Sequence, residues 1–330
     1  IIIYITSLFS ILNNLGQLQV YSFSGILFII SLLYSRRILS FDQLGELFNY
    51  SNNKNRIMLI GIGSISLIYL FSAMAPILDG DSLSAYLDIP RRFVFHGGIV
   101  SLPYELYSST PLNMQMLSVF SLIIGDDILA QMMVGYAMTM GTAFVIFIIC
   151  KRFYTKEIGL YAMLFFLTTY VVEFLIAGTK VNAGRAFFDL LAIYSVCRFI
   201  MDDKCSSRKW LITAGVFSGS ALASHYPSGI MVFIIMLLLG YYVLIISEKN
   251  KYKNSIYAMF LYGIPVIILS SPWLIKNYFE TGNPFYPVFN SLFLGNEYLI
   301  KEALDRANDN TKNLFTMFWS ISTGFTASGY

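Results

Sequence analysis

Charged side chains crowd one short stretch, "ILDGDSLSAYLDIPRR" at residues 77–92, directly after a long apolar run. Asp79 and Asp81 flank a glycine, and Arg91 and Arg92 follow a proline. A positioned carboxylate can take the proton of a hydroxyl nucleophile, and a fixed cation can stabilise a departing phosphate. The stretch therefore carries the residue types that a group transfer to a hydroxyl needs.

Each of these residues also has a structural explanation. An Asp-Gly-Asp sequence is typical of a turn that caps a helix, and its two carboxylates also resemble part of a divalent-cation site. Arg91 and Arg92 lie on "AYLDIPRRFVFH", which reads as an amphipathic interfacial helix, where basic pairs anchor to anionic head groups. The sequence leaves these alternatives open, so a divalent cation stays an option and its ligands stay unknown.

Further candidates lie in the turn "AGTKVNAGR" and beside it. Lys180 is a candidate for binding substrate. Arg185 lies four residues before Asp189, a spacing that predicts a structural ion pair on a helix. Glu173 lies inside an apolar segment, where an unpaired charge costs about 2.5–3.5 kcal/mol. We therefore expect Glu173 to face the protein interior and to find a partner.

His225 follows a stripe of small residues and precedes a proline. The stripe, Gly215, Gly219 and Ala223, has four-residue spacing and predicts close helix packing. Two roles stay open for His225, which are donation to a phosphate and capping of the helix end.

The last candidates precede and enter "ETGNPFYPVF". Lys276 and Asn277 are placed to contact a lipid phosphate, with Tyr286 as part of a rigid aromatic wall. Trp273 is expected to anchor the chain at the membrane–water interface.

Composition defines the environment of these residues. The 330 residues are 56% hydrophobic and 12% charged, with a mean hydropathy of +0.65, whereas soluble domains carry about 25% charged residues. An integral membrane protein is therefore predicted. The net charge of +3 is small and its basic residues are scattered, which argues against nucleic acid as a partner.

Apolar runs near the length that crosses a bilayer recur along the chain. We place them at about 1–12, 20–35, 57–76, 128–150, 158–177, 185–201, 210–224, 229–247 and 255–272. A shorter run at 112–125 is expected to lie at the interface or to be partly immersed. Residues 1–330 are expected to form one transmembrane domain, truncated at both ends.

Basic residues set the predicted orientation. If the spans alternate, 14 of the 22 basic residues fall in loops on one side, which we assign to the cytoplasm. They are Arg36, Arg37, Lys54, Arg56, Lys151, Arg152, Lys156, Arg198, Lys204, Arg208, Lys209, Lys249, Lys251 and Lys253. Cys150, Cys197 and Cys205 fall at the same face, where thiols stay reduced, so no disulfide is expected.

The opposite, outer face receives loops of a different chemistry. These are residues 77–111, 177–185, 224–228 and 271–289, which combine acids, bases, aromatic residues, proline and glycine. The candidate site residues all lie in these loops, so the site is expected on the outer side.

The ordered set of outer motifs resembles a known family. "PILDGDSLSAYLDIPRRFVFHGGIVSLP", "STPLNMQML", "GVFSGSALASHYPSG" and "SPWLIKNYFETGNPFYPVF" look like bacterial lipid-linked-sugar glycosyltransferases of the GT-C type. This group is related to dolichyl-phosphate-mannose protein mannosyltransferases, and the resemblance covers roughly residues 57–295. It implies an all-α, polytopic transmembrane helix bundle with a long first outer loop that carries interfacial helices.

The chain departs from the usual family pattern at a few positions. Ala85 and Tyr86 stand where many relatives have Tyr-His, and His225 stands where a lysine is frequent. Asn182 occupies a position where an aspartate is common. These departures bear on which substrate the chain accepts.

The resemblance implies transfer of a sugar from a polyprenyl-phosphate donor to a glycan, lipid or protein acceptor at the membrane surface. The donor lipid and membrane lipid are thus the expected partners, and the outer face of a bacterial or archaeal plasma membrane is the expected location. Asp81 is the expected base, and Asp79 is expected to position it or a metal ion. Asp88 would lie about 10 Å away along a helix, too far to share a proton.

Two other classes stay as alternatives. A glycan polymerase or ligase of cell-surface polysaccharide is chemically close, but its main polar outer loop is expected later in the chain. A multi-pass transporter would carry ionisable groups near the bilayer midplane, often in repeated halves. Here the charges crowd one edge, which favours the glycosyltransferase.

Overall fold

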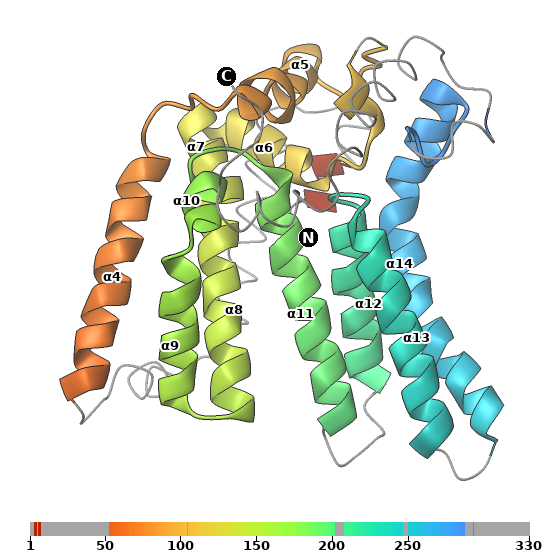
Figure 1. The fold of residues 1–330 in the computed structure, drawn as a ribbon. Helices are drawn as coiled ribbons and strands as arrows, with labels where there is room; N and C mark the ends of the chain where they lie inside the picture. The colour runs from red at the N-terminus through yellow and green to blue at the C-terminus, as the bar shows by residue number, and fades with distance from the viewer. Residues whose placement is uncertain are drawn as a thin grey trace, which may run out of the picture. The chain divides into compact units, whose positions relative to one another are not determined.

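The computed structural model describes residues 3–4, 6–7, 53–103, 105–201, 208–246, 250–287 and 293. Within these residues the regular structure is helical, as predicted, and no strand is present (Figure 1). The predicted spans at about 1–12 and 20–35 lie outside the described residues, apart from four residues of the first.

The chain divides into two compact units. The first comprises residues 1–100 and 111–271, and the second comprises residues 101–110 and 272–330. The prediction of a single domain over the whole chain stays a prediction.

Helices of the first unit follow one another with short connections. In chain order they are α4 (Asn53–Ala73), η1 (Ser82–Tyr86), α5 (Asp88–His96), α6 (Asn113–Ile124), α7 (Asp127–Gln131), η3 (Met132–Ala137), α8 (Met138–Phe153), α9 (Lys156–Leu167), α10 (Tyr170–Ile176), α11 (Val181–Met201), α12 (Arg208–Leu222), α13 (Ser228–Ile246) and the first part of α14 (Lys251–Thr281). The segments η1 and η3 are π-helical.

Four of the predicted spans are confirmed as helices long and apolar enough to cross a membrane. They are α4, the continuous stretch Asp127–Phe153, α13 and α14. Their apolar side chains are largely exposed, as with Ile60 and Phe71 of α4. So much exposed apolar surface requires lipid around it, so the chain is a multi-pass integral membrane protein. The predicted spans at 185–201 and 210–224 are helical too, as α11 and α12.

The predicted span at 158–177 is not one straight helix. It forms α9 and α10, which are bent by 67° relative to one another. At the break the hydroxyls of Thr168 and Thr169 donate to the carbonyls of the preceding turn, and Thr169 is extended. Such local side-chain bonds compete with the helix ladder. The bend exposes Glu173, so the expectation that Glu173 faces the interior is wrong.

The short helix α6 was expected to lie at the interface or to be partly immersed, and in the structure it is buried in protein. Ten of its 12 residues are buried, including Asn113, Gln115 and Ser118. The half-exposed amphipathic helix is instead α5, where Ile89 and Phe93 are buried and Phe95 is 85% exposed. The prediction of helices within the loop at 77–111 is therefore confirmed.

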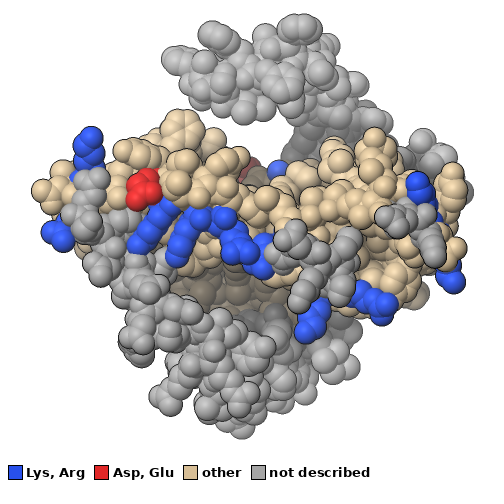
Figure 2. Space-filling model, turned by 90° about the horizontal axis from the view of Figure 1, so that it is seen from below, with Lys and Arg blue, Asp and Glu red and all other residues tan. Residues whose placement is uncertain are grey.

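Basic side chains gather on one face of the first unit. The beginnings of α4, α9, α12 and α14 and the ends of α8, α11 and α13 lie together at the lower side of Figure 1. Seen from that side, Figure 2 shows a band of Lys and Arg with little acidic surface. The basic residues at these helix ends include Lys54, Lys151, Arg198, Lys209 and Lys251. This is the gathering that the predicted alternation of spans requires.

The second unit contains η2 (Leu106–Ser109) and the last part of α14. The sequence predicted a loop from residue 271 onward, but α14 continues to Thr281. Gly282 follows the helix and has a positive φ of 77°. Glycine adopts this conformation without strain and is typical just after a helix. Trp273 is 2% exposed, so the prediction of an interfacial anchor is wrong.

Candidate active site

Two predicted acids and one predicted base meet in the first unit. The Lys180 ammonium lies 2.8 Å from Oδ1 of Asp79 and 3.7 Å from Oδ2 of Asp81. Its side chain is 3% exposed, whereas those of Asp79 and Asp81 are 22% and 72% exposed. The three residues form a cluster that is closed on the lysine side and open at Asp81.

Asp79 is held rigidly. Its Oδ2 accepts hydrogen bonds from the Ser82 amide at 2.9 Å and the Ser82 hydroxyl at 2.7 Å. Burial alone would raise the pKa of Asp79, but the hydrogen bonds from Lys180 and Ser82 outweigh it and lower the pKa. Asp79 is therefore ionised and fully engaged, and it caps the turn η1.

Ser82 also joins the segment that contains Asp79 to the segment just before Lys180. The Ser82 hydroxyl accepts a hydrogen bond from the Thr179 amide at 3.0 Å. A Cβ on Gly178 would lie 2.5 Å from that hydroxyl, so only glycine permits the contact. The segment that carries Lys180 thereby lies directly against the segment that carries Asp79.

Gly135 supports the same junction from η3. A Cβ at this position would collide with the carbonyl oxygen of Gly178 and would lie 2.9 Å from those of Leu175 and Ile176. π-helical turns inside longer helices are frequent at functional sites. Here the π-helical turn brings a glycine against the end of α10.

Phe174 of α10 closes the cluster beneath the lysine. Its ring centroid lies 3.8 Å from the Lys180 ammonium. A cation over an aromatic face gains electrostatic stabilisation where water is excluded. The Lys180 charge is thus stabilised on one side by a ring and on the other by carboxylates.

Asp81 differs from Asp79 in its environment. It precedes η1, but its side chain makes no capping hydrogen bond. Its exposed carboxylate can therefore accept a proton from an incoming hydroxyl without first breaking a bond to the backbone.

The predicted arginine pair makes ion pairs within the first unit. Arg91 pairs with Asp127 at the start of α7 through two nitrogens, one of them Nε at 3.3 Å from Oδ1. Arg92 Nε lies 2.6 Å from Oδ2 of Asp88, one turn earlier on α5. Both arginines are about half exposed. A guanidinium has five N–H donors, so each retains donors for a further ligand.

His225 lies near a polar group on α11. The predicted pair of Arg185 and Asp189 is confirmed, with 3.9 Å between Nε and Oδ2, and the Ser228 hydroxyl donates to Asp189 at 2.9 Å. Burial, with a smaller contribution from Arg185, lowers the pKa of His225 to about 4. A neutral imidazole can donate one hydrogen bond but supplies no positive charge.

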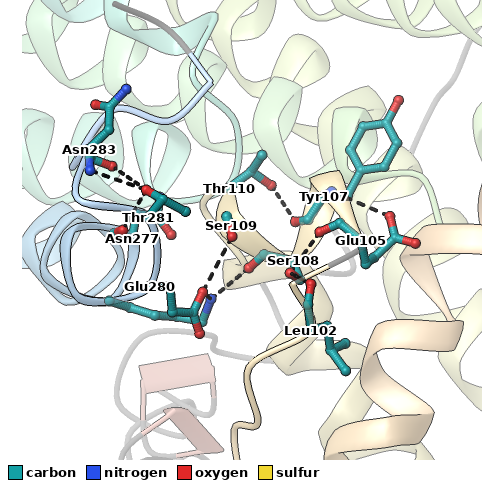
Figure 3. A network of polar contacts seen from close by, with 11 residues as sticks. Leu102, Glu105, Tyr107, Ser108, Ser109, Thr110, Asn277, Glu280, Thr281 and Asn283 are labelled. Carbon is teal, nitrogen blue, oxygen red and sulfur yellow. Dashed lines mark hydrogen bonds and ion pairs between the residues drawn. The ribbon is translucent and has the colours of Figure 1, made fainter. Parts of the chain in front are cut away.

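The remaining predicted residues belong to the second unit. Lys276 lies 2.5 Å from Oε2 of Glu280, one turn further along α14, and donates to the Ser108 carbonyl at 2.6 Å. Figure 3 shows this network with Ser109, whose hydroxyl lies 3.4 Å from Glu280. The Lys276 ammonium therefore fastens η2 to the last turns of α14.

Asn277 and Tyr286 are both fully buried in the second unit. The Asn277 carbonyl accepts from the Thr281 hydroxyl at 2.8 Å, and that hydroxyl also donates to the Asn283 carbonyl at 3.1 Å (Figure 3). These contacts terminate α14.

Several site residues escaped prediction. Ser82 and Gly178 stand in quoted motifs, but their contact joins segments about a hundred positions apart. Glu280 had a detectable signal, because it follows Lys276 by four residues, the spacing of helical ion pairs. In the described part of the chain, no three His, Cys, Asp or Glu side chains are arranged to hold a metal ion.

The fold and this cluster define a class, namely a multi-pass helical membrane protein with an acid–lysine cluster at the end opposite its basic face. Residues 108–275, half of the chain, match the family model of the dolichyl-phosphate-mannose-protein mannosyltransferases. The chain belongs to this family and is a membrane glycosyltransferase. No curated protein and no solved structure matches it. The matched region contains Lys180 and His225, whereas Asp79 and Asp81 precede it.

Proposed function

We propose that this glycosyltransferase moves a sugar from a polyprenyl-phosphate donor to a hydroxyl group of a glycan, lipid or protein acceptor. The observation that carries the proposal is the exposed carboxylate of Asp81 beside the ion pair of half-buried Asp79 and buried Lys180. One acid is fixed and neutralised, and the other is free to react.

In this mechanism Asp81 takes the proton of the acceptor hydroxyl. The acceptor oxygen forms a bond to the anomeric carbon as the bond from that carbon to the phosphate oxygen breaks. The electron pair leaves with the polyprenyl phosphate, which departs as an anion. Proton removal of this kind contributes about 10²- to 10⁴-fold to a rate.

Arg91 and Arg92 are the proposed contacts for the donor phosphate. They project from the amphipathic helix α5, are about half exposed, and keep unused donors beside their carboxylate partners. Lys276 suits this role less well, because its side chain is only 10% exposed and its ammonium already has two acceptors. We therefore assign Lys276 and Asn277 to holding the second unit together.

The reaction is proposed on the extracytoplasmic side. Basic residues are enriched in cytoplasmic loops, and the basic face of the first unit lies at the opposite end from η1 and α5 (Figures 1 and 2). Labelling of introduced cysteines tests this proposal. Cysteine at Ser84 of η1 should react with a membrane-impermeant thiol reagent in intact cells, and cysteine at Lys151 should react only after permeabilisation. The reverse pattern would contradict the assignment.

Product analysis tests the reaction itself. Membranes that contain the chain are supplied with a radiolabelled polyprenyl-phosphate hexose, and we expect released polyprenyl phosphate in equal amount to sugar on acceptor. Movement of the intact donor without release would indicate a transporter instead. Long repeating glycans as the product would indicate a polymerase.

A further inference from the structure

We propose that Lys180 is the resident cation of the acid pair. Its ammonium takes the position between Asp79 and Asp81 that a divalent metal ion would otherwise fill, so sugar transfer needs no divalent ion. This inference rests on the proposed function for its meaning in catalysis, but the site itself can be tested without it.

The first support is the shared position of the two carboxylates. Asp79 and Asp81 each direct one oxygen toward the same Lys180 nitrogen, at 2.8 Å and 3.7 Å. Two carboxylates that converge on one point form the core of a divalent site. Here the point of convergence is occupied by a side chain of the protein.

Burial fixes the ammonium in that position. The Lys180 side chain is 3% exposed and lies against the Phe174 ring. A buried charge is stable only when it is paired, so the lysine cannot leave its carboxylates without a large cost in free energy. A divalent ion at the same place would meet this positive charge directly and would be repelled.

Charge balance explains what the lysine achieves. One ammonium neutralises one carboxylate, so the pair of Asp79 and Lys180 is neutral overall and Asp81 keeps its negative charge. A divalent ion would neutralise both acids and leave no free base. The resident ammonium therefore orients Asp81 while sparing it for proton transfer, which makes Lys180 a positioning residue.

Replacement of Lys180 by methionine should expose the latent site. Met keeps the apolar stem against Phe174 but removes the charge, leaving two neighbouring carboxylates that repel each other. A divalent ion should then bind between them. Lys276→Met is the matched control, because Lys276 is a second buried lysine that has one carboxylate partner, Glu280.

Thermal unfolding of the purified full chain in detergent reads out metal binding directly. We expect Mn²⁺ to leave the Tm of the wild type and of Lys276→Met unchanged and to raise that of Lys180→Met by about 2–4 °C at ten times its Kd. EDTA should not reduce transfer by the wild type. Transfer by Lys180→Met should fall and should not recover with Mn²⁺, because the divalent ion would neutralise Asp81 as well as Asp79.

Two results would overturn the inference. One is a metal requirement of the wild type, seen either as loss of transfer in EDTA with recovery in Mn²⁺ or as a rise of its Tm with Mn²⁺. This result would overturn the inference even if Lys180→Met does not fold. The other is a folded Lys180→Met variant whose Tm does not change when Mn²⁺ is added. Absence of sugar transfer under every condition would instead refute the proposed function, and the Tm measurements would still test the site.

Discussion

Two buried lysines, one in each unit, each pair with a carboxylate, but the two ion pairs have different roles. Lys180 pairs with Asp79, 101 positions away, and has a second carboxylate nearby that is 72% exposed. Lys276 pairs with Glu280 on its own helix and donates to a loop carbonyl, and both partners of the pair are largely buried. The first cluster keeps an accessible charge, whereas the second is saturated. We infer that the first is arranged to react and the second to fasten a loop.

Removing each lysine in turn tests this comparison most strongly. Lys180→Met should lower turnover by about 10²-fold or more, because the acid pair loses the cation that orients it. Lys276→Met should act on stability instead, by about 3–5 kcal/mol, because Glu280 is left without its cation. Turnover per folded molecule and denaturant unfolding, measured on both variants, separate the two effects. Equal loss of turnover in both would remove the distinction.

Steric support of the first cluster gives the next test. Gly135→Ala should destabilise the protein by about 1–3 kcal/mol, because its Cβ would collide with three backbone carbonyls that cannot rotate away. Gly63→Ala on α4 is the control, since nothing lies within 4 Å of its Cβ, and Ala favours a helix. Unfolding midpoints check this prediction. A neutral Gly135→Ala would show that the junction between α10 and η3 is looser than described.

The pH dependence of stability tests His225. Its folded pKa of about 4 lies below the ordinary value of 6.5, so the unfolded chain binds the proton more tightly. Its contribution is fully present above pH 6.5 and is lost as pH falls toward 4, by about 1–3 kcal/mol. His225→Asn should flatten the unfolding free energy over this window. An unchanged slope would show that His225 titrates normally.

Arg91 gives the smallest expected effect. Arg91→Gln should raise the KM for the lipid donor about three- to tenfold and leave kcat nearly unchanged, because an exposed ground-state contact is lost. Lys151→Gln on the opposite, basic face should change neither constant. A fall in kcat at saturating donor would mean that Arg91 acts in the transition state.

Sequence reasoning succeeded where the signal was local and continuous. The spans α4 and α13 were predicted because each is a long apolar run, and the Arg185–Asp189 pair because its spacing is that of one helical turn. The end of α14 was missed because the apolar run stops before it. The polar residues Lys276, Asn277 and Glu280 made this helical segment resemble a loop.

The site was only partly predictable. Asp79, Asp81 and Lys180 were each identified as candidates. No spacing in the sequence reveals that the two acids contact the nitrogen of a lysine about a hundred positions further along the chain. The roles within the acid pair depend on which carboxylate accepts from Ser82, and that follows from the fold of one turn. Gly135 matters because it contacts the backbone at the end of α10. The residues around Gly135 in the sequence give no sign of this contact.

The most direct test of the account compares three Asp→Asn variants at saturating donor. Asp81→Asn should lower kcat by about 10²- to 10⁴-fold while the protein still inserts and binds donor, because the base is lost. Asp126→Asn should retain activity, since Asp126 is an exposed helix cap and Asn caps equally well. Near-normal turnover of Asp81→Asn together with an inactive, folded Asp79→Asn would contradict the account and move the base to Asp79.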